Sequence, residues 1–150
     1  IDSDHMMAIS PDVGATGRAI YLANVLNLDM GMFYKRRDFS RVVDGRNPIV
    51  AHEFLGSSVE GKDVIILDDM ISSGDSMLDV ARQLKQRKAK RIFCAATFGL
   101  FTNGLEKFDQ AYEEGILDAV LTTNGSISSI LNPIERIQNV VTKYKNGEEV

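Results

Sequence analysis

The stretch that most constrains the fold is "VIILDDMISSGDSMLDVARQL", which spans residues 64–84. Four consecutive apolar residues lead into two carboxylates, Asp68 and Asp69. A continuous apolar run of this length is typical of a strand that is covered on both faces, as in parallel sheets. A short polar loop follows, and then apolar residues recur with the spacing of a helix over residues 75–87. We therefore expect a buried strand over residues 63–69, a polar loop and an amphipathic helix.

The same alternation of strand and helix patterns recurs along the whole chain. Strands are predicted at 5–10, 30–34, 63–69, 91–98 and 119–123, and helices at 15–27, 75–87, 102–115 and 132–147. Asn103 and Glu106 form a variant of the capping box for the third helix. Residues 38–62 are interpreted as an excursion from the main sheet, with a short strand at 51–56. This order predicts one α/β domain with a parallel sheet, right-handed crossovers and three Rossmann-like layers.

Composition narrows the classes of function. The net charge of −4 argues against a general nucleic-acid binder, which needs a basic surface. Cys94 is the only cysteine, so no internal disulfide can form, and we expect a cytoplasmic protein with Cys94 as a buried apolar residue. No apolar run approaches 18 residues and no signal-peptide pattern is present, so we expect no membrane partner.

The loop after the central strand has the features of a phosphate site. Ligands of open α/β sheets bind beyond the carboxyl ends of the strands. At the start of the next helix, unpaired N–H groups and the helix dipole favour an anion. Hydroxyl groups add donors and the glycine allows a close approach to the ligand. The residues of this loop are Ser72, Ser73, Gly74, Asp75 and Ser76.

The adjacent carboxylates of Asp68 and Asp69 would repel the same phosphate, so they must face another part of the ligand. Vicinal sugar hydroxyls are donors that carboxylates accept, and a divalent metal ion would also suit them. A sugar phosphate satisfies both halves of the stretch. Two alternatives to a sugar-phosphate site are an acidic pair at a strand end that binds no ligand, and a receiver-type domain.

Four segments together resemble one family. "VIILDDMISSGDS", with its "VEGK" lead-in, resembles the ribose-phosphate loop of the type I phosphoribosyltransferase fold. "ISPDVGATGRA", "YKRRD" and "TTN" resemble, in the same order, the further motifs of the ribose-phosphate pyrophosphokinases, which are the phosphoribosyl pyrophosphate synthetases. The resemblance covers about residues 7–124, and the ordered set is far more specific than any single motif.

The resemblance implies a function in nucleotide biosynthesis. The family transfers the β,γ-diphosphoryl group of ATP to the 1-hydroxyl of ribose 5-phosphate with Mg²⁺, which gives AMP and phosphoribosyl pyrophosphate, and its members are homo-oligomers. By the same resemblance, Lys35 and Arg37 are catalytic and Asp12 helps to bind Mg²⁺. Asp68 and Asp69 hold ribose hydroxyls, and the serine-rich loop holds the 5-phosphate.

Some of these residues also have purely structural interpretations. Asp12 could cap the following helix, and the "KRR" segment could be solvated cations. Phe98 replaces a histidine that is common in the family. The family has two similar domains, and this chain resembles the second, so we expect the N-terminal domain to be missing and the 150 residues alone to be inactive. The short passage near 124–129 also suggests a missing segment.

Other functions remain open at this stage. A nucleobase phosphoribosyltransferase would share the ribose-phosphate loop, although no hood for base recognition is evident. A non-catalytic regulatory subunit of a synthetase would bind ribose phosphates or nucleotides. A receiver domain is the weakest alternative, because no lysine follows the strand at 91–98.

Overall fold

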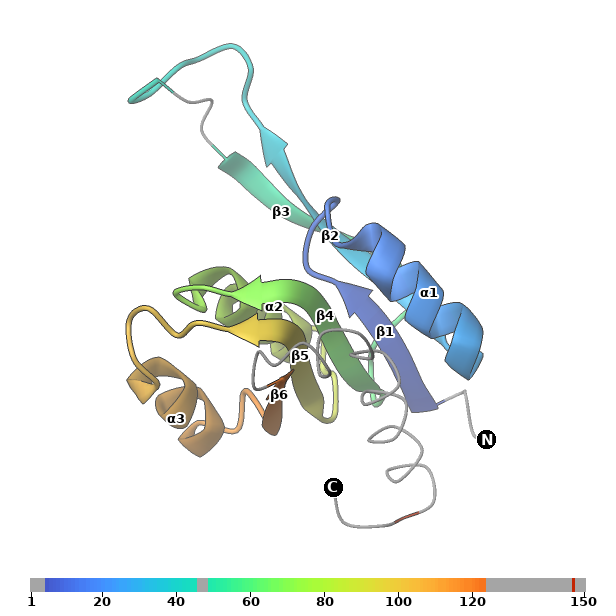
Figure 1. Ribbon diagram of the computed structural model, residues 1–150. Helices are drawn as coiled ribbons and strands as arrows, with labels where there is room; N and C mark the ends of the chain where they lie inside the picture. The colour runs from blue at the N-terminus through green and yellow to red at the C-terminus, as the bar shows by residue number, and fades with distance from the viewer. Residues whose placement is uncertain (1–4, 46–48, 124–146, 148–150) are drawn as a thin grey trace.

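The computed structural model describes residues 5–45, 49–123 and 147. Its strands are β1 (Met6–Ser10), β2 (Asp29–Arg37), β3 (Ile49–Gly56), β4 (Asp63–Ile71), β5 (Ile92–Gly99) and β6 (Ala119–Thr123). Its helices are α1 (Thr16–Leu26), α2 (Asp75–Gln86) and α3 (Glu106–Glu113). Figure 1 shows their arrangement. The predicted strand and helix types are correct for all of these elements.

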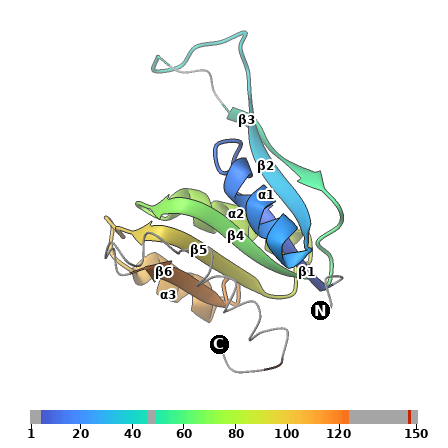
Figure 2. The ribbon, with the colours of Figure 1, turned by 45° about the vertical axis from the view of Figure 1, so that its right-hand side comes forward.

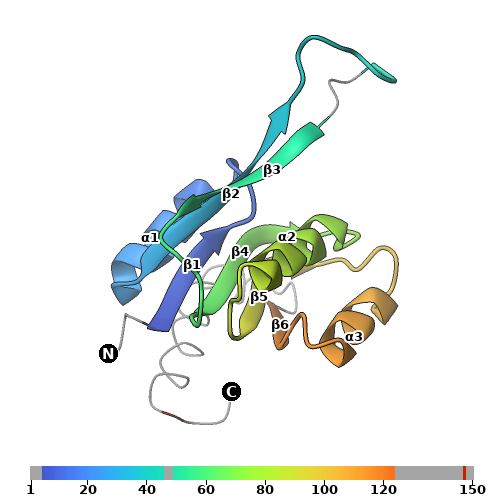
Figure 3. The same cartoon turned by 180° about the vertical axis from the view of Figure 1, so that it is seen from behind.

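The strands form one sheet in the order β3-β2-β1-β4-β5-β6. The pairs β1–β2, β1–β4, β4–β5 and β5–β6 are parallel, and β3 runs antiparallel to β2 at one edge. Helix α1 covers one face of the sheet, and α2 and α3 lie on the other (Figures 2 and 3). The predicted three-layer, mainly parallel α/β architecture is therefore confirmed.

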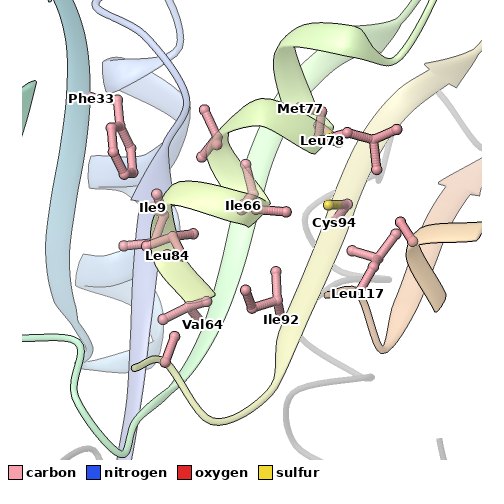
Figure 4. Close-up of a cluster of buried hydrophobic side chains, with 14 of the residues drawn as sticks. Ile9, Phe33, Val64, Ile66, Met77, Leu78, Leu84, Ile92, Cys94 and Leu117 are labelled. Atoms are coloured by element: carbon pink, nitrogen blue, oxygen red, sulfur yellow. The ribbon is translucent and has the colours of Figure 1, made fainter. Parts of the chain in front are cut away.

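The central strand β4 is buried on both faces, as its apolar run predicts. Val64 and Ile66 belong to the hydrophobic cluster on the side of α2, which Figure 4 shows. Ile65 and Leu67 belong to the cluster on the side of α1. Cys94 is buried in the first cluster, and burial raises the pKa of its thiol, so it serves as a small apolar core residue.

Strand β2 is longer than predicted. The sequence pattern predicts a strand that ends at residue 34, before "KRRD", but β2 continues through Arg37. The reason is β3, whose antiparallel ladder pairs Lys35 with His52 and Arg36 with Ala51. This pairing stabilises an extended backbone for residues whose own propensity is weak. We call the outer part of this pair, residues 34–37 and 49–53, the basic ribbon; it extends away from the rest of the sheet (Figure 1).

Helix α3 begins later than predicted. It starts at Glu106 with Leu105 as its N-cap, and no side chain caps it, so the predicted capping box with Asn103 is wrong. Tertiary hydrogen bonds explain the shift. The N–H groups of Leu100 and Phe101 donate to the Ile71 carbonyl, and the residue after them donates to Ser72. These bonds hold the chain in a loop before the helix can start.

The predicted helix at 132–147 and the segment near 124–129 lie outside the described residues. None of the described helices has both the length and the apolar character that crossing a membrane requires.

Candidate functional site

The carboxyl ends of β1 and β4 lie side by side. Their parallel register pairs Ile9 with Ile66, so the turn after Ser10 and the acidic end of β4 share one edge of the sheet. The Asp12 charge is among those that act on Asp68, which places the two carboxylates in one electrostatic environment. Loop 72–76 follows directly from β4 at this edge. The structure thus brings together three of the predicted site segments.

Arg18 holds the acidic pair. It lies in the first turn of α1, and its Nη2 is 3.3 Å from Asp68 Oδ1 and 3.6 Å from Asp69 Oδ1. Its Nε is buried and has no hydrogen-bond partner among the described residues. Sequence reasoning missed this residue, because only the direction of α1 over the sheet brings Arg18 to positions fifty residues away.

The two carboxylates differ in their environment. The Asp68 side chain is 25% exposed, whereas that of Asp69 is 61% exposed. Burial raises the pKa of Asp68, and the nearby charges of Asp69 and Asp12 also raise it, while the Asp69 N–H, at 2.8 Å from Asp68 Oδ1, acts in the opposite direction. The Arg18 guanidinium also favours the charged form. Asp68 is therefore a partly desolvated carboxyl group whose pKa lies above its ordinary value.

Asp12 is exposed and shapes the turn after β1. Its Oδ1 accepts a hydrogen bond of 2.9 Å from the N–H of Ala15, and its carbonyl accepts one of 2.6 Å from Ser10 Oγ. The alternative that Asp12 caps the following helix is not borne out, because Ala15 is the N-cap of α1 and no side chain caps that helix, so the contact belongs to the turn. A metal role remains compatible with it, because Mg²⁺ commonly uses one or two protein carboxylates and completes its shell with water and substrate phosphate. The described residues contain no group of three or more His, Cys, Asp or Glu suited to a metal ion.

The loop before α2 depends on Gly74. Its φ of 83° lies in the left-handed region, and a β-carbon there would be 2.3 Å from Cζ of Phe108 in α3. Glycine was predicted to allow a ligand to approach, but its described neighbour is this aromatic ring. No side chain caps the N-terminus of α2, and Ser72 and Ser76 are exposed beside it. Within this turn the Asp75 N–H donates to Ser73 Oγ at 3.4 Å, and the uncapped start of α2 still favours an anion.

Asp75 would oppose an anion in this loop, but its charge is paired. Lys107 Nζ donates to Asp75 Oδ1 at 2.6 Å, and Ser73 Oγ donates to Asp75 Oδ2 at 3.0 Å. These hydrogen bonds, from Lys107 first and Ser73 second, hold the pKa of Asp75 below its ordinary value. Lys107 lies in α3 and was not predicted as a site residue. Its positive charge offsets that of Asp75 and so reduces the repulsion of a phosphate in the loop.

Lys35 and Arg37 lie on the basic ribbon and are exposed. Among the described residues, no ion pair joins Lys35 to Asp68 or Asp69. Because side chains alternate along a strand, Lys35 and the intervening Arg36 point to opposite faces. Arg36 pairs with Glu53, whose Oε1 is 3.3 Å from its Nε. The described contacts therefore do not bring Lys35 together with the acidic pair, and its catalytic role stays a prediction.

The last predicted motif, "TTN", is described only in part. Thr122 and Thr123 end β6, and Thr123 Oγ1 donates to the Thr97 carbonyl at 2.6 Å. Asn124 lies outside the described residues. Phe98, at the end of β5, is 36% exposed near the same edge.

Comparisons with known proteins agree with this geometry. The sequence matches the phosphoribosyl transferase domain family over residues 4–128. It is 32% identical over 120 residues to the ribose-phosphate pyrophosphokinase of Mycoplasma genitalium, covering 79% of this chain and 34% of that protein. It is 33% identical over 133 residues to that of Thermococcus kodakarensis, covering 88% and 45%.

A solved structure shows the same fold. It is the phosphoribosylpyrophosphate synthetase of Mycobacterium smegmatis, with a TM-score of 0.64 and 21% sequence identity; the match covers 97% of this chain and 47% of that one. The chain therefore spans less than half the length of these relatives. The resemblance inferred from the motifs is confirmed: this chain belongs to the phosphoribosyl transferase domain family, in the form found in the ribose-phosphate pyrophosphokinases.

Proposed function

We propose that this chain is the ribose-phosphate-binding half of a ribose-phosphate diphosphokinase. The observation that carries the proposal is the succession of two elements at the end of β4. Asp68 and Asp69 offer carboxylate acceptors, and the uncapped N-terminus of α2 offers donors only a few residues later. A sugar phosphate likewise carries hydroxyl donors and an anionic group in one molecule. The relatives named ribose-phosphate pyrophosphokinase support the same assignment.

In this proposal the loop and the acidic pair orient ribose 5-phosphate. The 5-phosphate accepts hydrogen bonds from the N–H groups and hydroxyls of loop 72–76, and the charge on Lys107 limits repulsion by Asp75. The ribose hydroxyls donate to Asp68 and Asp69. Binding the sugar at both ends fixes the 1-hydroxyl, which is the group that attacks ATP, in a defined position.

The basic ribbon supplies positive charge. Phosphoryl transfer depends on positioning and on neutralising the charge of the transferring group more than on covalent help. Lys35 and Arg37 are carried on an exposed two-stranded ribbon, so they must approach the diphosphoryl group from the side of β2. Asp12, with Asp68 nearby, would hold Mg²⁺, which neutralises phosphate charge when it is bound.

Two further features belong to the proposal. We place the protein in the cytoplasm, where a buried cysteine such as Cys94 stays reduced and ATP is supplied. We also propose a homo-oligomer. A nucleobase phosphoribosyltransferase or a regulatory subunit would keep the same sugar-phosphate site. The "KRR" segment on the ribbon favours the diphosphokinase over both.

The test is an assay of the full-length protein with ATP, ribose 5-phosphate and Mg²⁺, in which AMP and phosphoribosyl pyrophosphate are both quantified. We expect equal amounts of the two products, and strong loss of both in Asp68→Asn. The 150-residue chain alone should bind ribose 5-phosphate without turnover. If phosphoribosyl pyrophosphate is consumed with a nucleobase while no AMP forms from ATP, the protein is a nucleobase transferase and the proposal is wrong.

A further inference from the structure

His52 is a largely buried titratable residue that the proposed chemistry does not use. It lies on β3 at the inner end of the basic ribbon, and its side chain is only 12% exposed. Both ring nitrogens are buried and have no hydrogen-bond partner among the described residues. Because buried polar atoms are nearly always hydrogen-bonded, this arrangement calls for an explanation.

The His52 imidazole lies between strand β2 and helix α2. Its ring centroid is 5.0 Å from that of Phe33 on β2, at an interplanar angle of 56°. Its Nδ1 is 4.0 Å from Oδ2 of Asp79 on α2, which is beyond hydrogen-bond distance. Lys35 is its direct partner in the antiparallel ladder. The contact thus joins three elements, β2, β3 and α2.

The contact connects two parts of the proposed site. Paired residues of an antiparallel ladder point to the same face, so Lys35 leaves the ribbon on the side of His52. Asp79 lies one turn beyond Asp75, on the helix whose N-terminus forms the phosphate loop. His52 therefore stands between the strand that carries a catalytic cation and the helix that carries the loop.

We propose that His52 is a positioning residue: its neutral imidazole holds the basic ribbon, and with it Lys35, against α2, and protonation of the ring weakens that contact. The role of Lys35 in this inference rests on the proposed function. The docking of the ribbon on α2 does not, because it is a property of the fold.

The charges around the ring set the direction of the effect. Burial is the main cause that lowers the pKa of His52 from its ordinary value of 6.5, and the charges of Lys35 and Arg87 lower it further. Only Asp79 acts in the opposite direction. Arg87 follows α2, with its guanidinium 5.4 Å from the Phe33 ring centroid. Above pH 6.5 the ring is neutral and the contact is intact; as the pH falls through the lowered pKa, an imidazolium forms between two cations and the contact weakens.

The direct test is a pH titration of the 150-residue chain by NMR. The chain has two histidines, and the exposed His5 provides a reference in the same spectrum; His5→Asn assigns the two ring signals. We expect His52 to titrate below 6.5, with the amides of residues 33–37 and 51–54 shifting at the same midpoint. If His52 titrates at 6.5 or above, or if the ribbon amides do not follow its ring, the inference is wrong.

Two variants distinguish a positioning role of His52 from a general contribution to stability. His52→Leu cannot titrate, so the ribbon amides should lose their transition at the His52 midpoint. Asp79→Asn, at an exposed position, removes the carboxylate that favours the imidazolium, so the midpoint should move to lower pH. An unchanged midpoint in Asp79→Asn, or a ribbon transition that survives in His52→Leu, overturns the inference.

Turnover by the full-length protein then tests the link to Lys35. His52→Leu should lower kcat at neutral pH and flatten its decline in acid, while KM for ribose 5-phosphate stays close to that of the wild type. If His52→Leu lowers kcat and 1/KM by the same factor, and kcat still declines in acid as it does in the wild type, a positioning role is contradicted. If the protein does not make phosphoribosyl pyrophosphate at all, the proposed function fails, and the titrations above still decide whether His52 holds the ribbon.

Discussion

Arg18 Nη2 lies 3.3 Å from Asp68 Oδ1, so that a residue of the first turn of α1 contacts the end of β4 from fifty positions away. The same nitrogen is 3.6 Å from Asp69. One guanidinium thus lies against both carboxylates at this edge of the sheet. It also links the start of α1 to the end of β4.

Removing the Arg18 guanidinium should change the pKa of Asp68 clearly and the free energy of unfolding only slightly. We expect Arg18→Gln to raise the pKa of Asp68 further, and to lower the free energy of unfolding by no more than about 1 kcal/mol, because the pair is partly exposed. Carboxyl NMR titration and urea denaturation measure the two effects. Arg41→Gln, which breaks a pair with Asp38 in the segment after β2, is the control and should leave the pKa of Asp68 unchanged. An Asp68 pKa that is the same in Arg18→Gln and wild type contradicts the account.

Gly74→Ala should destabilise the chain strongly. The new β-carbon meets both a left-handed backbone and the Phe108 ring at 2.3 Å, which together cost about 2–5 kcal/mol. Gly61→Ala is a matched control, since its φ is 72° but nothing lies within 4 Å of the added carbon; it should cost about 1–2 kcal/mol. Chemical denaturation gives both values.

A double-mutant cycle isolates the steric part of that loss. Phe108→Leu should recover some stability in Gly74→Ala but none in Gly61→Ala. Equal penalties for the two glycine variants, or no coupling between Gly74 and Phe108, would show that the ring does not constrain the loop.

The proposed catalytic cation can be compared with its strand neighbour. We expect Lys35→Ala in the full-length protein to lower kcat by about 10²–10³-fold with little change in KM for ribose 5-phosphate, because charge stabilisation is needed chiefly in the transition state. Arg36→Ala removes an adjacent cation from the opposite face of the ribbon, where it pairs with Glu53, and should change kcat little. Steady-state kinetics of both variants decide; similar losses in the two would contradict a specific role for Lys35.

Sugar binding should depend on the charge of Asp68. Its pKa is raised from the ordinary 3.8, so acidification should neutralise this carboxylate, and weaken its hold on the sugar hydroxyls, at a higher pH than for an unperturbed aspartate. Calorimetric affinities of wild type and Asp68→Asn for ribose 5-phosphate should converge as the pH falls. The comparison cancels the titration of the phosphate itself. A gap between the two proteins that does not narrow in acid contradicts the prediction.

The same raised pKa has a consequence for stability. A carboxyl group whose pKa is higher in the folded state binds its proton more readily there, so its contribution favours folding at low pH. That contribution is lost as the pH rises from the ordinary value through the raised one. Asp68→Asn should therefore increase the free energy of unfolding at neutral pH, which urea denaturation can measure. A decrease would show that the pairing with Arg18 outweighs desolvation.

The strands and helices could be predicted because each carries its own pattern. The apolar run before Asp68 indicates a strand buried on both faces, and the small polar loop after it indicates a turn into a helix. The features that the sequence did not reveal depend on partners distant in the chain. Strand β2 continues to Arg37 because β3 pairs with it, and α3 starts late because residues 100–102 bond to the loop after β4.

The same division holds for the candidate site. The acidic pair and the serine-rich loop are contiguous, so the local pattern identifies them. Arg18 in α1 contacts the acidic pair, and Lys107 in α3 contacts the loop. A local sequence pattern cannot predict such long-range contacts. The tertiary environment of Gly74 was also hidden: the sequence predicts a glycine that lets a ligand approach, while the position of Phe108 explains why a side chain has no room there.

The central claim is that the end of β4 and the start of α2 bind the two ends of one sugar phosphate. Calorimetric titration of the 150-residue chain with ribose 5-phosphate, ribose and inorganic phosphate tests it most directly, with Asp68→Asn beside the wild type. We predict that ribose 5-phosphate binds far more tightly than either fragment and that Asp68→Asn loses most of this advantage. Equal affinities for ribose 5-phosphate and phosphate, unchanged in Asp68→Asn, would contradict the account.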